Sequence, residues 1–506
     1  MDGAVTWRGR TGEHSHEVEA GWQTSYEYQA FKMFFTGMGD SYVDFLSPAG
    51  SPLNTVLCDA DPTLNPNASD PNQITGNGCS QKTHSNDVDT LQRGYFIGLY
   101  AQDRWKPTSW LMVMPGLRWD INRVWVPGGL PADAYRTLVI NARTVNTGDY
   151  QMANGFGPRL TGIADLTGDK KTIFQASYGR STEQLYLTTV SDAQSSYQAQ
   201  SLTYTWNQAA KRFDPITNQA TPNNTLVDSA GRTFPHHDEL FFRLSREIAR
   251  NTVAEVDYTY RYYTNILEQA EVNRIWDPSG SRVAGYVDPS HPNAVFVYTN
   301  DNRNWQKYSG FDLIFESRPT PNLDFFGSYT LSWTWGPGYS ENRGGLGQFY
   351  NPRDAQFFSG WNPSSDVRHI IKTQTTYTLH GAVIGATVNW RSGYANFKQF
   401  PVNAPFTTNS RFRSPFGTDP SATNDIHQWT EFRVPDLFVV SLLLGYDFYE
   451  LTRNHFLLTV SMENLLNNYT PVGLQTSETA PPTRFGTVTA RNNPSFRTTI
   501  GLKYTY

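Results

Sequence analysis

The chain has 506 residues with a net charge of −5, and only 17% of its residues are charged while 14% are aromatic. The charges are interspersed and form no basic patch, which argues against a nucleic-acid partner. No run of 18 or more apolar residues occurs, so the sequence predicts no transmembrane helix. These properties still allow an outer-membrane β-barrel. Its strands alternate apolar and polar residues and its loops are hydrophilic, so the mean hydropathy of a sequence window does not detect it.

Strand-like alternation recurs along the chain in pairs of segments that are joined by short turns. Within residues 253–263, for example, Val256 and Tyr258 fall on one face and Glu255 and Asp257 on the other. The predicted pairs are residues 3–8 with 16–35, 95–102 with 111–122, 156–166 with 172–180, 239–248 with 253–263, 311–317 with 323–335, 367–379 with 382–391, and 436–448 with 456–463. In the turn at residues 167–170 we expect Gly168 and Asp169 to take the positive-φ positions.

Long connections alternate with these short turns, and this asymmetry predicts the fold class. The long ones are about 39–90, 123–155, 181–237, 264–305, 336–366, 392–433 and 464–494. Long loops on one side and short turns on the other are typical of outer-membrane barrels, where the loops are extracellular and the turns periplasmic. We therefore expect an all-β, antiparallel transmembrane barrel wall.

The last strand, residues 495–506, alternates cleanly and ends on an aromatic residue. Leu502, Tyr504 and Tyr506 share its apolar face. Aromatic residues mark the membrane–water boundary of outer-membrane barrels. We expect these three residues to form the signal for the barrel-assembly machinery, with the C-terminus on the periplasmic side.

The strand total is about fifteen, and single-chain bacterial barrels have an even number with both ends periplasmic. Counting back from a periplasmic C-terminus makes the first strand begin outside the cell. The odd count predicts that residues 1–506 are the C-terminal part of a larger barrel domain. Residues 1–10 also carry no signal-peptide pattern.

Several segments resemble a known family. Residues 96–105 (FIGLYAQDRW) and 114–120 (MPGLRWD) resemble a pair of barrel strands in TonB-dependent outer-membrane receptors. Residues 156–160, 176–180, 366–369, 462–467 and 485–488 resemble the Oar-type branch of these receptors. The resemblance extends from about His14 to Tyr506.

The resemblance implies a 22-stranded barrel, plugged by an N-terminal domain and driven by the TonB energy-coupling complex of the inner membrane. Its ligands are expected to be scarce and bulky: an iron chelate, cobalamin, an oligosaccharide or a peptide. This sequence departs from the family pattern because the plug, the coupling box, the signal peptide and roughly the first third of the barrel are absent. Coupling to TonB is therefore expected only through an N-terminal region outside this chain.

Two groups of residues are candidate ligand contacts. The first lies on the polar face of the strands: Arg118, Asp120, Glu255, Asp257, Arg261 and Arg391. These residues either solvate and brace the lumen through ion pairs or contact a ligand on its way through. The second group comprises loop aromatics, which either stack on a ligand ring or pack loop against loop: Tyr339, Phe349, Tyr350 and Trp361.

The sequence offers little catalytic or metal chemistry. Cys58 and Cys79 lie in one polar segment, and a loop-closing disulfide is the natural interpretation. Residues 236–239 (HHDE) and the aspartates around the cysteines lack the spacing of a metal site. No nucleophile elbow or phosphate loop is present. We expect no enzyme activity, no cofactor and no resident metal.

Three functions remain open. The first is the barrel of a TonB-dependent receptor in the bacterial outer membrane, surrounded by outer-membrane lipid. The second is a stand-alone porin-like channel of 14 or 16 strands, and the third is a secreted all-β carbohydrate-binding protein. The face assignment predicts that Tyr258→Arg impairs assembly while Asp257→Asn is tolerated.

Overall fold

The computed structural model describes most of the strands and parts of their connections. The described residues are 1–12, 14–33, 40–43, 81–85, 88–127, 137–140, 143–146, 150–185, 187, 190, 201–207, 212–215, 225–229, 232–276, 283–289, 295–300, 305–336, 348–349, 366–396, 432–453, 455–474, 488–491 and 495–505. In this part of the chain, no helix has the length and apolar character needed to cross a membrane.

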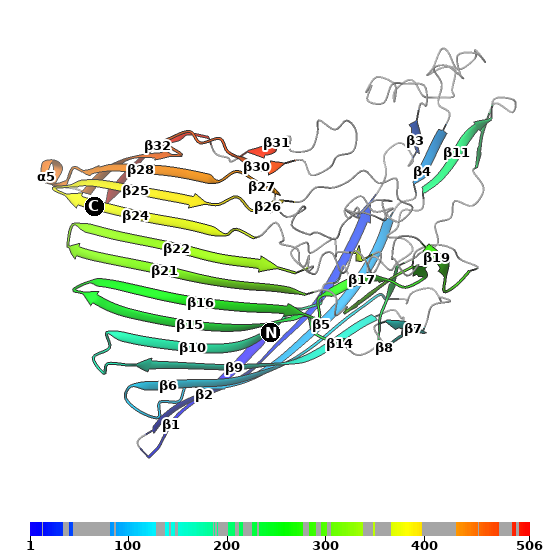
Figure 1. Cartoon of the computed structure of the whole chain (residues 1–506), viewed down its shortest axis with the longest axis horizontal. Coiled ribbons are helices and arrows are strands. Elements are labelled where there is room, and N and C mark those ends of the chain that lie inside the picture. The colour runs from blue at the N-terminus through cyan, green and yellow to red at the C-terminus, as the bar shows by residue number, and fades with distance from the viewer. Residues whose placement is uncertain are drawn as a thin grey trace, which may run out of the picture.

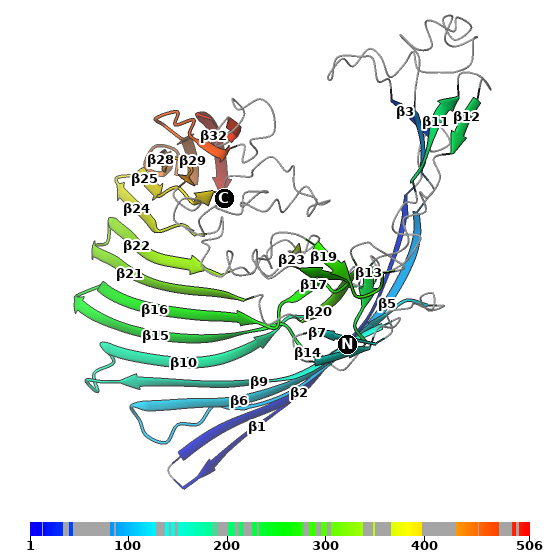
Figure 2. The ribbon, with the colours of Figure 1, turned by 45° about the vertical axis from the view of Figure 1, so that its right-hand side comes forward.

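One large antiparallel sheet dominates the fold, and its strands follow one another as a meander (Figure 1). Figures 1 and 2 show these strands stacked in sequence order as a single curved wall. Its fifteen strands are β1 (Asp2–Thr11), β2 (His14–Met33), β5 (Val88–Asp103), β6 (Leu111–Trp125), β9 (Tyr150–Asp165), β10 (Thr172–Thr182), β15 (His236–Ala249), β16 (Thr252–Thr264), β21 (Gln306–Thr320), β22 (Leu323–Trp335), β24 (His369–Leu379), β25 (Ala382–Arg391), β28 (Leu437–Asp447), β29 (His455–Glu463) and β32 (Arg497–Thr505).

This meander confirms the fifteen predicted strands and their pairing as hairpins. The predicted ends are less accurate than the strands themselves: β5 begins at Val88 and β9 at Tyr150, both inside connections that were predicted to be loops. In the described part of the chain, the edge strands β1 and β32 do not pair with each other, so the wall is open between them.

The long connections are not entirely loop, which corrects the sequence-based prediction. They contain short strands that build small sheets beside the wall: β3 (Asp40–Val43), β4 (Gln81–Ser85), β7 (Thr137–Ile140), β8 (Arg143–Asn146), β11 (Ser201–Asn207), β12 (Arg212–Pro215), β13 (Thr225–Val227), β14 (Arg232–Thr233), β17 (Leu267–Glu271), β18 (Arg274–Trp276), β19 (Val283–Tyr286), β20 (Phe296–Asn300), β23 (Gln348–Phe349), β26 (Ala395–Asn396), β27 (Phe432–Arg433), β30 (Pro471–Leu474) and β31 (Val488–Arg491). The turn between β28 and β29 holds a one-turn helix, α5 (Tyr449–Thr452).

The short turns lie together at the opposite end of the wall from the long connections (Figure 1). In the turn between β9 and β10 the positive-φ residues are Gly168 (φ 75°) and Lys170 (φ 62°), so the expectation for Asp169 was wrong. Asp169 instead accepts hydrogen bonds from the Thr167 hydroxyl and the Lys171 backbone, and these bonds lower the pKa of its carboxyl group. Asp169 therefore stabilises the turn through hydrogen bonds to its side chain and not by adopting a positive φ.

The outward face of the wall carries a band of exposed apolar side chains. Leu117, Leu244, Leu313, Ile384 and Leu502 lie on five different strands and are 51%, 46%, 49%, 49% and 64% exposed. A soluble protein rarely leaves such a contiguous apolar surface in water, whereas the outward face of a membrane barrel requires it. The band therefore indicates a lipid-facing surface.

Candidate functional site: the inner wall

The inner face of the wall is the polar one, as the alternation predicted. On β6, Trp119 is 36% exposed on the outward face, while the adjacent Asp120 is 1% exposed. On β16, Val256 is 46% exposed and Asp257 only 5%. Asp120 and Asp257 thus lie on the inner face, and the described neighbours of all six candidate residues can now be named.

Arg118 and Asp120 form one ion pair on the inner face of β6. The Arg118 Nε donates to Asp120 Oδ1 at 2.7 Å, and Arg118 Nη2 donates to Gln23 at 3.0 Å. Thr182 donates to the second carboxylate oxygen of Asp120 at 2.7 Å. Gly98 lies opposite Asp120, and a Cβ atom there would come within 2.4 Å of Arg118 Nη2. A side chain at position 98 would therefore displace the ends of this pair.

Glu255 and Asp257 share one arginine, Arg243 on the neighbouring strand β15. Arg243 binds Asp257 through two hydrogen bonds of 2.9 and 2.7 Å and approaches Glu255 within 3.1 Å. Such two-pronged arginine–carboxylate contacts fix geometry as well as charge. Both candidate carboxylates are therefore neutralised by the wall itself.

Arg261 and Arg391 differ in their surroundings. Arg261 pairs with Glu239 across the β15–β16 ladder, and its guanidinium lies 5.8 Å from the Tyr308 ring centre. Arg391 ends β25, where its register neighbours are Ile370 and Leu437. Within the described residues no ion pair involves Arg391. Of the six candidates, Arg391 alone lacks an ion-pair partner among the described residues.

The other sequence-predicted residues are placed only in part. Leu502 and Tyr504 lie on the edge strand β32 and are 64% and 56% exposed. Phe349 belongs to β23, which pairs in parallel with β17. The remaining ones lie outside the described residues: Cys58, Cys79, Tyr339, Tyr350, Trp361 and Tyr506. Among the described residues no group of three potential metal ligands occurs, and both ring nitrogens of His236 have partners, the Phe234 carbonyl and the Thr264 hydroxyl.

Sequence reasoning missed that part of the connection between β10 and β15 folds onto the inner face of the wall; we call it the insertion. After Gly179, β10 leaves β9, and the two-residue strand β14 takes its place by pairing in parallel with Ala153 and Asn154. Gly155 and Gly157 make this possible, since a Cβ atom on Gly157 would lie 2.8 Å from the Arg180 carbonyl oxygen.

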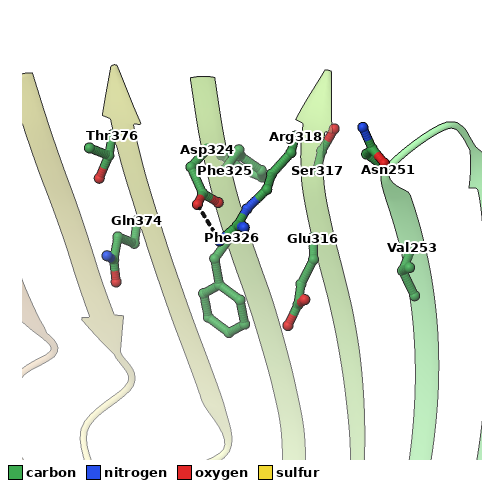
Figure 3. Close-up of a pocket in the computed structure, with 10 residues that line it drawn as sticks. All are labelled: Asn251, Val253, Glu316, Ser317, Arg318, Asp324, Phe325, Phe326, Gln374 and Thr376. Carbon is green, nitrogen blue, oxygen red and sulfur yellow. Dashed lines mark ion pairs between the residues drawn. The ribbon is translucent and has the colours of Figure 1, made fainter. Parts of the chain in front are cut away.

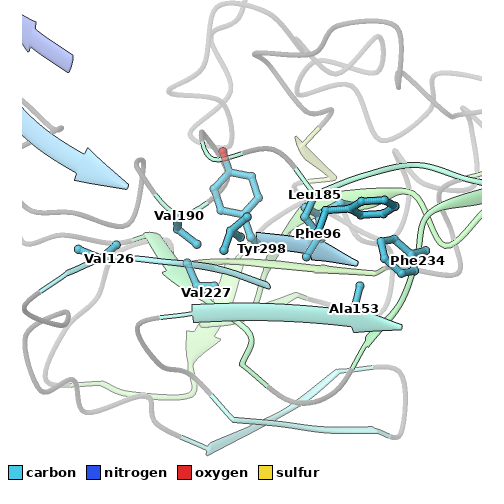
Figure 4. Packing of buried hydrophobic residues seen from close by; sticks show 10 residues of the cluster. Phe96, Val126, Ala153, Leu185, Val190, Val227, Phe234 and Tyr298 are labelled. Atoms are coloured by element: carbon cyan, nitrogen blue, oxygen red, sulfur yellow. The ribbon is translucent and has the colours of Figure 1, made fainter. Parts of the chain in front are cut away.

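This insertion is held by an apolar core (Figure 4). The fully buried side chains of Phe234, Val227 and Val190 pack with Phe96 and Val124 of the wall. Connection residues thus pack against the inner face of β5, β6 and β9. The sequence has no period-2 pattern that predicts this cluster, because its members come from segments far apart in the sequence.

A second missed feature joins the long connections to one another. Asp366 is fully buried, accepts a backbone hydrogen bond from Thr334 at 2.9 Å and pairs with Arg368 and Arg433. Arg433 also donates to the carbonyl oxygens of Asp366 and Gly393 at 2.9 Å. This cluster ties together the end of β22, the segment before β24, the segment after β25 and the segment before β28.

The inner face is hollowed near the turn end (Figure 3). A cavity of about 690 Å³ lies over β16, β21, β22 and β24. Its lining includes Glu316, Phe326 and Gln374, together with the ion pair between Arg318 and Asp324, whose atoms are 2.7 Å apart. The cavity opens toward the lumen, so the wall here can contact whatever fills the lumen.

An apolar outward band, an ion-paired inner wall and an antiparallel meander together define a membrane-barrel wall. A family model, the outer membrane beta barrel domain, matches residues 15–396. The chain belongs to this family.

Solved structures with the same fold are TonB-dependent receptor barrels. The outer membrane transporter YddB from Escherichia coli matches with TM-score 0.52 and 13% identity over 99% of this chain and 52% of that chain. The ferric citrate transporter FecA matches with TM-score 0.52 and 10% identity over 100% and 54%. The ferric-catecholate import receptor Fiu of E. coli K12 matches with TM-score 0.51 and 13% identity over 100% and 54%.

The chain thus spans about half the length of the structures it matches. No curated protein sequence matches it significantly.

Proposed function

We propose that the chain is the C-terminal part of the barrel of a receptor that takes up a scarce, bulky ligand, such as an iron chelate, an oligosaccharide or a peptide. The similarity to the folds of YddB, FecA and Fiu supports this proposal. The observation that carries it is the polar, ion-paired inner wall behind an apolar outward band. A soluble carbohydrate-binding protein would expose such an apolar band to water, which is unfavourable.

In this proposal the long connections face the outside of the cell, and the turns and the C-terminus face the periplasm. Barrels of this type have short periplasmic turns and long extracellular loops. The two open edges of the wall and the coverage of about half of each matched structure support further strands and a plug in the whole receptor. Coupling to TonB and insertion by the barrel-assembly machinery belong to that whole protein.

We further propose that the inner-face candidate residues have two different roles, bracing the wall and contacting the ligand. Arg118, Asp120, Glu255, Asp257 and Arg261 brace the wall, because each is already paired with a neighbour. Arg391 is the member that meets an anionic ligand, because no described carboxylate neutralises it.

The test uses the full-length gene product in a Gram-negative host that lacks its own siderophore receptors. Iron-limited growth is scored with a panel of ferric chelates, and uptake is scored with labelled oligosaccharides and peptides, each with and without a functional TonB. TonB-dependent uptake of one ligand class supports the proposal. TonB-independent diffusion, together with conductance in a planar bilayer, would instead identify a passive channel.

A further inference from the structure

The outward face carries two arginines at the end of the wall where the long connections lie. Arg93 on β5 is exposed, and Arg123 on β6 is half-buried. Both share the outward face with Ile97 and Leu99, which belong to the apolar band. Arg123 lies two residues before the end of β6, near the long-connection end of the wall, and the outward-facing Leu91 lies beyond Arg93 on β5.

Aromatic rings surround both arginines. The Arg123 guanidinium lies 4.6 Å from the Tyr150 ring centre and 5.8 Å from that of Trp125. Trp125 in turn lies 6.2 Å from Tyr95 and 6.3 Å from Tyr26. Cation–π contacts of this kind occupy the face of the guanidinium and leave N–H groups at its edge for an anion. Aromatic residues also anchor a barrel at the membrane boundary.

Neither arginine is neutralised within the described part of the chain. The register neighbours of Arg93 are Tyr28 and Trp125, and those of Arg123 are Tyr95 and Met152. No carboxylate stands among these four neighbours, and no described residue forms an ion pair with either arginine. The Arg123 Nε is buried and has no hydrogen-bond partner. Most charged groups of the inner wall are paired, so two unpaired cations on the outward face require another explanation.

We propose that Arg93 and Arg123 bind the phosphate groups of the glycolipid in the outer leaflet of the outer membrane, while the surrounding aromatic rings contact its sugar and upper acyl region. Guanidinium matches phosphate through paired, charge-assisted hydrogen bonds, which supports a phosphate rather than a neutral headgroup. The site rests on the proposed function, which places the long-connection end in the outer leaflet. It is a lipid site on the wall's exterior, separate from the route of any ligand through the lumen.

The experiment measures binding of purified lipid A to the full-length gene product in detergent by native mass spectrometry. The test variant is Arg93→Gln/Arg123→Gln. The matched control is Arg246→Gln/Arg250→Gln, which removes the same charge at the turn end, where Arg246 is an exposed, outward-facing residue of β15. We expect the test variant to bind bis-phosphorylated lipid A at least about tenfold more weakly, and the control to bind like the wild type.

The same titrations with dephosphorylated lipid A isolate the phosphate contacts. The wild type is expected to lose the same factor when the phosphates are removed, and the test variant to lose little more. Inorganic phosphate at millimolar concentration serves as the free-anion probe, and competition by it at that level would show a general anion site and overturn the lipid assignment. Unchanged binding by the test variant would overturn the proposal altogether.

Folding and location are checked separately. If the test variant assembles poorly, Arg93→Lys/Arg123→Lys is used instead; it keeps the charge but not the paired geometry, and an intermediate affinity is expected. Membrane fractionation of the wild type separates a failure of the proposed function from a failure of the lipid-site inference. A wild-type protein absent from the outer membrane contradicts the proposed function, whereas an outer-membrane protein whose lipid binding ignores both arginines contradicts only this inference.

Discussion

Placing an arginine at either of two consecutive residues near the centre of β24 tests which face of the wall meets lipid and which faces the lumen. Thr373 shares the outward face with Ile371 and Tyr377, which are 36% and 40% exposed. Gln374 points the other way and lines the hollow of the inner wall beside Phe326 (Figure 3). Both side chains are polar and neutral. The variants Thr373→Arg and Gln374→Arg therefore differ only in the face that receives the charge.

The expected difference follows from the environment of each face. An arginine near the membrane midplane on the lipid side of a barrel costs roughly 2–4 kcal/mol. The cost for Thr373→Arg lies in this range, because β24 runs from His369 to Leu379 and residue 373 is near its middle. This corresponds to an approximately 25- to 700-fold shift of the folding equilibrium, since each 1.4 kcal/mol is a factor of ten. Gln374→Arg places its charge on the inner face, in the cavity that Glu316 also lines, and is expected to cost less than about 0.5 kcal/mol.

The assay is refolding of the full-length protein into lipid vesicles, followed by urea titration of the heat-modifiable folded band. Thr373→Arg is expected to lower the urea midpoint, and Gln374→Arg is expected to leave it unchanged. Equal shifts for both variants, or a larger shift for Gln374→Arg, would refute the assignment of faces. Such a result would mean that the register of β24 is wrong by one residue.

Three further outcomes are expected in the same urea assay. Gly98→Ala should cost roughly 1–3 kcal/mol because the new methyl group collides with the ion pair beneath it, whereas Gly162→Ala, which meets nothing within 4 Å, should stay near the wild type. Asp257→Asn should cost about 1–3 kcal/mol because Arg243 loses its two-pronged acceptor; the structure thus revises the earlier expectation that this change is tolerated. Phe234→Ala should cost roughly 3–5 kcal/mol by leaving a cavity, and should speed proteolysis in the connections that the insertion holds.

The wall was predictable because each of its strands carries the signal locally. Alternation fixes the face of a residue from its immediate neighbours, as for Val256 and Asp257, and turn residues such as His380 and Gly381 mark the reversals. Strand ends were less predictable, since β5 and β9 run several residues into segments of polar composition. There the ladder of hydrogen bonds with the next strand extends the structure, and composition alone does not reveal it.

The inner insertion was not predictable for a different reason. β14 pairs in parallel with residues of β9 that lie about eighty positions earlier, and Asp366 pairs with Arg433 from 67 positions away. Neither contact leaves a periodic trace in the sequence. The same holds for partner choice between strands: alternation identifies Asp257 as lumenal, but only the strand register shows that Arg243 of β15 neutralises it.

The distinction between a bracing and a ligand-facing arginine is the part of the site that experiment can settle next. Arg118→Gln leaves the 1% exposed Asp120 without its cation, and removing one partner of a buried pair costs about 3 kcal/mol or more. Arg391→Gln breaks no described ion pair and is expected to stay within about 0.5 kcal/mol of the wild type. Urea titration of the two variants compares the same chemical change at two positions of one wall. A loss for Arg391→Gln as large as that for Arg118→Gln would show that Arg391 also braces the wall, and would remove the reason to assign it to a ligand.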